Sequence, residues 1–249
     1  MRVFAVVPVV LLAALQFANV HAAEAPPGAL AKVSMATVAR GEPLPAWAEP
    51  LSPIPPSNSP DALVQRLSEI QVSTGSGPTS VLYNRAIQIN HRAGLGEIGQ
   101  FALSFMPSHQ TLSLHRVAIL RGDAVLDRTA TVNARLLERE SELDNGTYGG
   151  ETTVQLLLDD VRVGDTLWVT WSVTGDNPVF GTHWGDMFHW DSNWPVVLRR
   201  LTISHPVSKP LFWQGHGGRL AADPGGWAQP GHPQRLQAVF GGSPGGAQS

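Results

Sequence analysis

The chain has 249 residues, no cysteine, and 20 acidic against 17 basic residues, which gives a net charge of −3 at pH 7. This mildly acidic balance without a basic cluster argues against nucleic-acid binding. The absence of cysteine from the sequence excludes disulfide bonds and thiolate catalysis by these residues.

Residues 1–23 have the pattern of a secretory signal peptide. Arg2 supplies a positive start, the apolar run Val3–Leu15 follows, and small residues stand at the end of the segment. The run is well short of the roughly 20 apolar residues that a membrane-spanning helix needs. We therefore predict cleavage before Ala23 or Glu24, and a periplasmic or secreted protein without a membrane anchor.

Residues 24–60 are rich in alanine, proline and serine, and we predict a linker that lies over the protein surface. The following stretch, from Asp61 to Val72, allows two interpretations. A helix would place Leu63, Leu67 and Ile70 on one face, whereas a strand would run through Ile70 and Val72.

From residue 61 to residue 214 the sequence predicts a series of short strands separated by turns. Apolar residues alternate with polar ones, as expected for half-buried strands, at 81–89, 101–105, 112–114, 154–158 and 167–173. Val117–Leu120 is continuously apolar, and 194–203 is a further candidate strand. Arg135 to Leu143 is an exception, where a turn or two of helix is possible. Strands at regular spacing without intervening helices predict an all-β fold, an antiparallel β-sandwich.

The end of the chain, residues 215–249, differs from this middle part. Glycine and proline recur there and no periodicity remains. Such a composition buries too little apolar surface to offset the entropy of ordering the chain, so we predict a disordered tail.

Six phrases in the middle of the chain occur together in a fixed order. They are Phe105–His115, Arg121–Asp123, Leu137–Glu140, Tyr148–Gly150, Leu158–Asp165 and Gly175–Gly181. In order and spacing they resemble a bacterial domain of unknown function that lies amino-terminal to transglutaminase-like domains in exported proteins. The resemblance covers residues 45–214.

This resemblance implies a β-sandwich, a location in the cell envelope, and a non-catalytic accessory role without a cofactor. In the fuller architecture of that family a transglutaminase-like core with a Cys-His-Asp triad follows, whereas this sequence stops soon after the accessory domain and has no cysteine. We therefore expect no enzyme activity. The expected partner is a transglutaminase-like domain, lost by truncation or present on another chain, or another envelope protein.

The most distinctive phrase is predicted to be a structural turn. It contains Asp159, Asp160, Arg162, Gly164 and Asp165 between two strands. Gly164 permits positive φ, and the aspartates can bond to turn amides. Arg116 and Arg121 are available to pair with Glu138, Glu140 or Asp159.

Two ligand-binding alternatives concern residues 183–194. His183, Asp186 and His189 are of the types that bind a divalent metal, which would suit a metal-dependent enzyme, although their spacing matches no zinc signature. The aromatic residues of this segment could instead form a platform for an envelope glycan or peptide: Trp184, Phe188, Trp190 and Trp194. A hydrolase with a serine nucleophile is poorly supported, because no G-x-S-x-G motif occurs.

An incomplete sandwich would leave a strand edge unpaired. We therefore also predict marginal stability or self-association.

Overall fold

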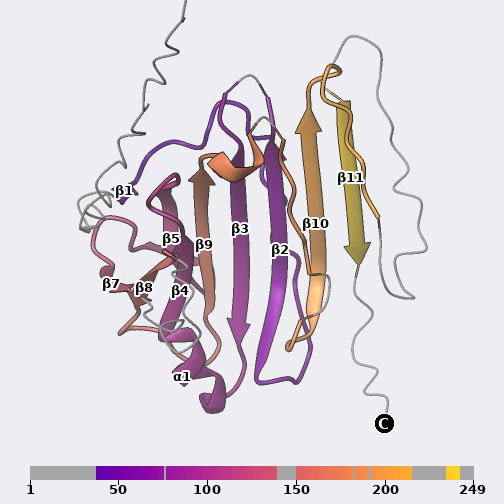
Figure 1. Ribbon diagram of the computed structural model, residues 1–249. Coiled ribbons are helices and arrows are strands. Elements are labelled where there is room, and N and C mark those ends of the chain that lie inside the picture. Colours follow the sequence, from indigo (N-terminus) through magenta and orange to yellow (C-terminus); the bar gives the residue numbers. More distant parts are fainter. Residues whose placement is uncertain are drawn as a thin grey trace, which may run out of the picture. The chain divides into compact units, whose positions relative to one another are not determined.

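A computed structural model describes residues 38–75, 77–138, 150–181, 183–189, 192–214 and 234–241 (Figure 1). The strands are β1 (Ala39–Arg40), β2 (Leu63–Ser73), β3 (Ser80–Ile89), β4 (Gln100–Phe105), β5 (Thr111–Arg121), β6 (Ala124–Asp127), β7 (Asn133–Glu138), β8 (Thr152–Leu157), β9 (Thr166–Thr174), β10 (Val196–His205) and β11 (Gln234–Gly241). The short helices are η2 (Arg92–Gly94), α1 (Leu95–Ile98) and η4 (Pro178–Phe180). No helix within these residues is long and apolar enough to cross a membrane.

The larger sheet has the strand order β1–β5–β9–β3–β2–β10–β11, and β6 pairs with β5 beside this path. Neighbouring strands are antiparallel except for β1 with β5 and β2 with β10, which are parallel. Because β9 and β10 run in the same direction, the chain between them travels back along the sheet (Figure 1). We call residues 175–195 the crossing segment; positions 182, 190 and 191 lie outside the described residues. The all-β prediction is confirmed. The predicted sandwich was antiparallel throughout, whereas the pairs β1–β5 and β2–β10 are parallel.

The smaller sheet, β4–β8–β7, is antiparallel and packs on one face of the larger sheet. The core between the sheets contains Leu103 and Leu156 from the smaller one, and Ile87, Leu114 and Val169 from the larger one. Each of these side chains is almost fully buried, and such burial is worth about 1.5–3 kcal/mol per side chain. The apolar residues at alternate positions of β9 face this core, as the sequence predicts.

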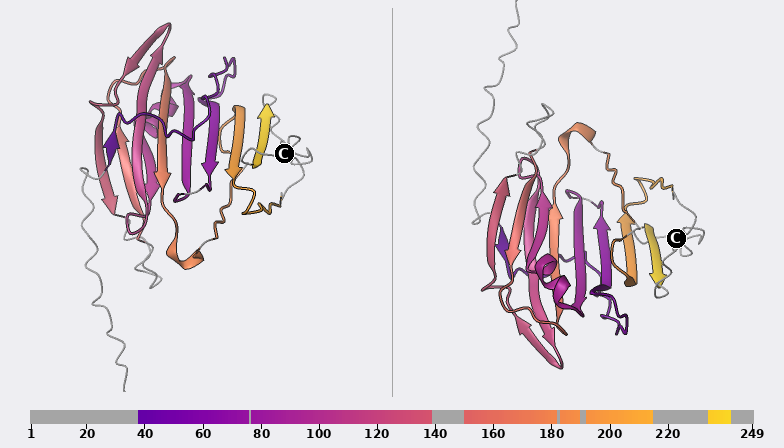
Figure 2. Two further views of the ribbon diagram at one scale, coloured as in Figure 1. Left: turned by 90° about the horizontal axis from the view of Figure 1, so that it is seen from above. Right: turned by 90° about the horizontal axis from the view of Figure 1, so that it is seen from below.

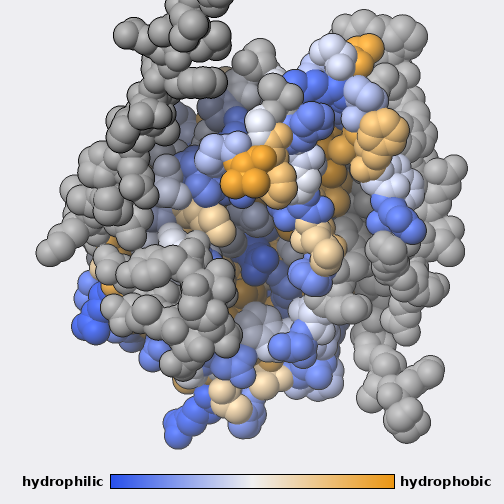
Figure 3. All heavy atoms as spheres, viewed as in Figure 1, coloured by the Kyte–Doolittle hydropathy of each residue, from blue (hydrophilic) through white to orange (hydrophobic). Residues whose placement is uncertain are grey.

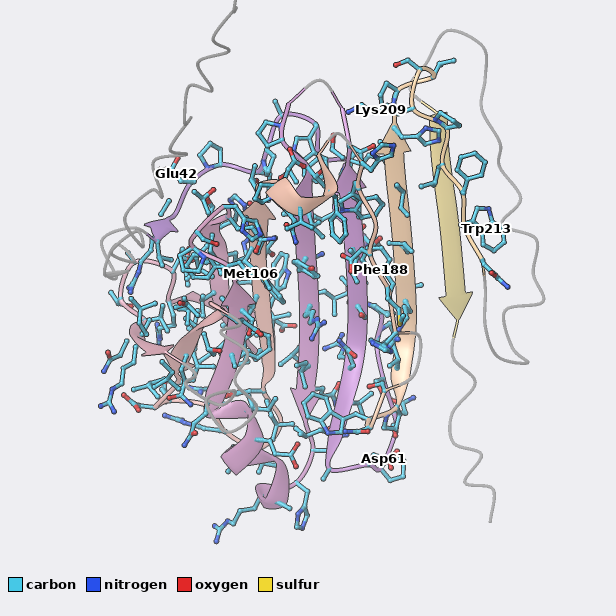
Figure 4. All side chains as sticks on the ribbon, viewed as in Figure 1. Glu42, Asp61, Met106, Phe188, Lys209 and Trp213 are labelled. Atoms are coloured by element: carbon cyan, nitrogen blue, oxygen red, sulfur yellow. The ribbon has the colours of Figure 1, made fainter. Side chains whose placement is uncertain are left out.

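A second apolar cluster continues the same face of the larger sheet beyond the smaller sheet. Residues of the crossing segment cover it, and Figure 4 shows the labelled Phe188 over β2 and β10. The buried members of the cluster are Val72, Val81, Leu201 and Ile203.

Residues 41–61, which we call the strap, cross the opposite face of the larger sheet. Figure 2 shows the strap in indigo and the orange crossing segment on opposite sides of that sheet. Proline removes backbone donors, so the strap cannot extend the sheet as a strand. Side chains of β2 hold it instead: Gln71 Oε1 accepts from Glu49 N at 2.8 Å, and Arg66 Nε donates to Pro55 O at 2.7 Å. Of the predicted linker, residues 24–37 lie outside the described residues.

Both suggestions of helix in the middle of the chain are wrong where the structure describes them. Residues 63–73 form β2, and Asn133–Glu138 form β7, while 139–149 lie outside the described residues. In β2 the helix-like spacing arises because apolar residues lie on both faces of one strand. Leu63 belongs to the core between the sheets, whereas Leu67 is buried on the strap face.

The tail that we predicted to be disordered contains one strand. Gln234–Gly241 form β11, which pairs antiparallel with β10 over its whole length. This stretch differs from the prediction because the edge of β10 offers backbone donors and acceptors that β11 satisfies. The rest of the tail lies outside the described residues.

Candidate functional site

Among the described residues of the two segments that follow β9 and β10, six large apolar side chains are exposed. The side chain of Val179 is 84% exposed and that of Phe212 is 89% exposed. We call the set the apolar surface: Val179, Phe180, Met187, Val207, Phe212 and Trp213. Figure 3 shows apolar colouring where Figure 1 places η4 and near the upper end of β10, and Figure 4 labels Trp213 beside β11. Large exposed apolar side chains on two segments that lie on one side of the sheet make these segments the candidate interaction site.

The local sequence explains why Val179 and Phe180 project outward. Asn177 caps η4, because its Oδ1 accepts from Val179 N at 3.0 Å, and Pro178 occupies the first turn. Gly181 ends η4 with a φ of +57°, which favours glycine. The turn therefore stands off the sheet, and its two apolar side chains remain exposed.

The predicted aromatic platform is partly used for packing. Trp184 and Phe188 are half-buried against the second apolar cluster, with their ring centres 6.3 Å apart. Trp194 is half-buried against the core between the sheets. Trp190 lies outside the described residues, and the glycan- or peptide-binding role of these aromatics stays a prediction.

The three candidate metal ligands have exposed side chains on the crossing segment. His183 N donates to Phe180 O at 3.0 Å, Asp186 Oδ1 accepts from Met187 N at 2.7 Å, and His189 O accepts from Arg199 at 2.9 Å. Across the part of the chain that the structure describes, no three His, Asp or Glu residues form a group that could hold a metal ion.

Asp165 anchors the predicted turn between β8 and β9. Its carboxylate accepts two hydrogen bonds from Arg121, from Nε at 2.9 Å and from an Nη at 2.8 Å, and a third from Arg162 N at 2.8 Å. Gly164 adopts a φ of +94°, and its N–H donates to Ile89 O at 2.7 Å. These contacts tie the turn to β3 and β5.

Asp160 extends the same charge cluster toward solvent. It pairs with Arg121 at 3.6 Å, Arg128 at 3.2 Å and Arg162 at 3.0 Å. For Asp165, burial alone would raise the pKa, but the bonds from Arg121 and the Arg162 amide outweigh it and hold the pKa below its usual range. Arg121 thus pairs with Asp160 and Asp165, and not with Asp159, within the described residues. The other expected partners, Glu140 and the side chain of Glu138, lie outside them.

A buried polar network on the strap face was not predicted from the sequence. The carboxylate of Glu69 accepts from Asn84 Nδ2 at 2.9 Å and from Gln71 Nε2 at 3.2 Å, and Asn84 Oδ1 accepts from Trp168 Nε1 at 2.7 Å. Polar residues at alternate positions of a strand normally indicate a solvated face. The only signal was the proline-rich stretch that turns out to cover this face.

Residues 76–225 match a family described as a domain of unknown function with a solved structure, DUF3857. The chain belongs to the DUF3857 family. The resemblance to a bacterial domain of unknown function is thereby confirmed. The DUF3857 match begins just after β2 and includes both the charge cluster and the apolar surface.

The DUF3857 fold is also similar to a solved structure. A crystal structure named as that of a putative protease from Parabacteroides distasonis ATCC 8503 aligns with a TM-score of 0.59 and 11% identity. The alignment covers 76% of this chain and 37% of that one, so this chain spans little more than a third of that protein's length. At this identity the likeness shows a shared fold alone. No curated protein matches the sequence.

Proposed function

We propose that this chain is an exported, non-catalytic accessory domain that docks on a transglutaminase-like domain through the apolar surface. The observation that carries the proposal is the exposure of Val179, Met187 and Phe212, which lie on the two segments that also supply the covering residues Phe188 and Leu211 of the second apolar cluster. Burying such side chains against a partner removes apolar area from water, which drives most protein association.

Two further observations support the choice of partner. The similar fold occurs within a longer chain named as a putative protease, of which it covers 37%. In addition, these 249 residues contain no cysteine, so the thiolate of a transglutaminase-like triad would have to come from the partner.

Site-specific photo-crosslinking in the source bacterium tests the docking. A photoreactive amino acid replaces Met187 in one variant and Phe212 in another. The matched control replaces Val125, which is also apolar and 61% exposed but lies on β6. We expect both test positions, and not the control, to capture a protein that contains a transglutaminase-like domain, identified by mass spectrometry.

Capture of that partner from Val125 as efficiently as from Met187 would remove the apolar surface from the proposal. Capture of other proteins alone, or of a second copy of this chain alone, would overturn the choice of partner. Substituting serine at Met187 and Phe212 should reduce copurification of the partner without changing thermal stability, because both side chains are exposed.

Export is tested separately by fractionation. The proposal expects the protein in the periplasmic or culture fraction, with a mature amino terminus at Ala23 or Glu24. An intact amino terminus on cytoplasmic protein would contradict export but would leave the docking experiment valid.

A further inference from the structure

A cavity of 220 Å³ lies between the strap and the larger sheet, on the face opposite the apolar surface. It is smaller than the roughly 300–1,000 Å³ of pockets for drug-sized ligands, so it suits a group about the size of one residue. Its walls combine apolar strap residues with polar residues of β5 and β9: Pro43, Leu44, Leu51, His115, Arg116 and Thr170.

A β-bulge brings the two basic residues of this cavity together. His115 and Arg116 are consecutive, so in a regular strand their side chains would point to opposite faces. The pairing of β5 with β9 shifts here, because Leu114 lies opposite Trp171 and Arg116 lies opposite Thr170. His115 is left as the extra residue, and both side chains reach the strap face.

Arg116 presents a guanidinium group with open donors. Its guanidinium carbon lies 4.0 Å from the centre of the Trp168 ring. Within the described residues the guanidinium makes no direct hydrogen bond or ion pair, although hydrogen bonds and, in smaller part, its charge lower the pKa of Asp127 on β6. Stacking occupies the face of the planar guanidinium and leaves the N–H groups at its edge free. Trp168 is itself held in place, because its Nε1 donates to Asn84, which the buried Glu69 carboxylate fixes in turn.

His115 fixes the strap at the mouth of the cavity. Its Nδ1 lies 3.0 Å from Glu42 O, and its Nε2 lies 2.9 Å from Ser172 Oγ. Since a carbonyl oxygen only accepts, Nδ1 donates to Glu42 O, and Nε2 shares the second hydrogen bond with the serine hydroxyl. Both ring nitrogens are therefore engaged, and Arg116 is left as the group that can bind a ligand.

We propose that this cavity binds a single carboxylate attached to a residue-sized apolar group, as in an acylated apolar amino acid or the carboxyl terminus of a peptide. The edge of a guanidinium matches a carboxylate in geometry and charge. Pro43, Leu44 and Leu51 provide the apolar contacts. Glu42 also lines the cavity, and its negative charge favours a monoanion over a multiply charged ion such as phosphate.

Isothermal titration of the full chain tests this assignment with four ligands. They are N-acetyl-leucine, a short peptide that ends in a free leucine carboxylate, and the carboxamide form of each. We expect saturable binding of at least one acid and at least about tenfold weaker binding of its amide. Binding of the free acid without the peptide would identify a small-molecule site, and preference for the peptide would identify a chain terminus.

Substitutions identify the residue responsible. Arg116→Gln should abolish binding, whereas Arg92→Gln, which removes an exposed arginine on η2, should leave it unchanged. Should Arg116→Gln fail to fold, the NMR signal of the Trp168 indole N–H in the wild-type chain provides a second measurement, and it should move with the acid and not with the amide.

The proposal would be overturned by any of four results: unchanged affinity in Arg116→Gln, equal binding of acid and amide, tighter binding of inorganic phosphate, or no saturable binding of either acid. None of these results depends on docking at the apolar surface.

Discussion

Glu69 Oε2 accepts a 2.9 Å hydrogen bond from the backbone N–H of Ser52, and the carboxylate is completely buried. The hydroxyl of Ser52 donates to the other carboxylate oxygen at 3.0 Å. A buried carboxylate is costly unless hydrogen bonds compensate for the lost water. Here the strap provides two of them, so the same contacts stabilise the charge on β2 and attach the strap to the sheet.

We predict that Glu69→Gln lowers the free energy of unfolding by about 2–4 kcal/mol. The NH₂ group that replaces one carboxylate oxygen cannot accept the hydrogen bonds which that oxygen accepts. Urea denaturation measures the change. Thermolysin cleavage within residues 41–61 should accelerate at the same time, because the strap loses its attachment. The exposed Glu97→Gln serves as a control and should change stability by less than about 0.5 kcal/mol. Equal stability of the two variants would contradict the role of Glu69.

Gly175 is predicted to be irreplaceable, and it belongs to one of the phrases that carry the family resemblance. Its φ is +149°, and a Cβ built on it would lie 1.9 Å from His109 O, so the backbone would have to move. Gly175→Ala should therefore cost about 3 kcal/mol or more.

The control for Gly175 is Gly122→Ala, where φ is +56° but a Cβ would meet nothing within 4 Å. There we expect only the conformational cost of about 1–2 kcal/mol. Thermal denaturation of both variants, followed by circular dichroism, compares the two costs. Similar melting temperatures would show that the contact with His109 is unimportant.

The Asp165–Arg121 pair predicts a pH dependence of stability. The pKa of Asp165 in the folded protein is lowered. Its contribution is therefore complete above the ordinary aspartate pKa of about 3.9 and disappears as the pH falls through the lower folded value. Asp165→Asn should be less stable than the wild type at neutral pH, and the difference should shrink below about pH 4.

Urea denaturation between about pH 7 and pH 2.5 measures this difference. Asp123→Asn, at an exposed position in the adjacent β5–β6 turn, is the matched control and should change stability little at any pH. A gap between wild type and Asp165→Asn that stays constant over this range would show that the Asp165 charge does not stabilise the fold.

Neighbouring residues of the crossing segment are predicted to differ in role. Phe188→Ala should reduce stability by about 1–3 kcal/mol, because its ring packs on the second apolar cluster. Met187→Ala should change stability by less than about 0.5 kcal/mol, because the side chain is 75% exposed. Chemical denaturation of both variants gives the comparison, and the reverse order would contradict the assignment of Met187 to the apolar surface.

Much of the strand content could be predicted because alternation has a local cause. Leu167, Val169, Trp171 and Val173 face the core between the sheets, so β9 appears directly in the sequence. The stretch from Asp61 to Val72 was ambiguous because both faces of β2 are covered, and the shift of register between Gln65 and Leu67 breaks the two-residue period.

The sites were harder to predict than the strands. The turn at Gly164 and Asp165 was predictable, because its glycine and aspartates act within a few residues of one another. Its partner Arg121 was not, because that pairing joins positions 44 residues apart. The apolar surface has no periodic signal, since its members belong to turns and connections instead of strands.

The sequence by itself determined what depends on near neighbours: the hydrophobic period of the strands, the turns with their glycines, and the phrases shared with a domain of unknown function. Only the tertiary structure decided which polar residues are buried and which apolar ones are exposed. Glu69 looks solvated until Ser52 covers it, and His115 and Arg116 look divergent until the bulge aligns them. The physical reason is that the strand register and the path of the strap depend on contacts between segments far apart in the sequence. No local sequence pattern specifies which side chains those contacts bury.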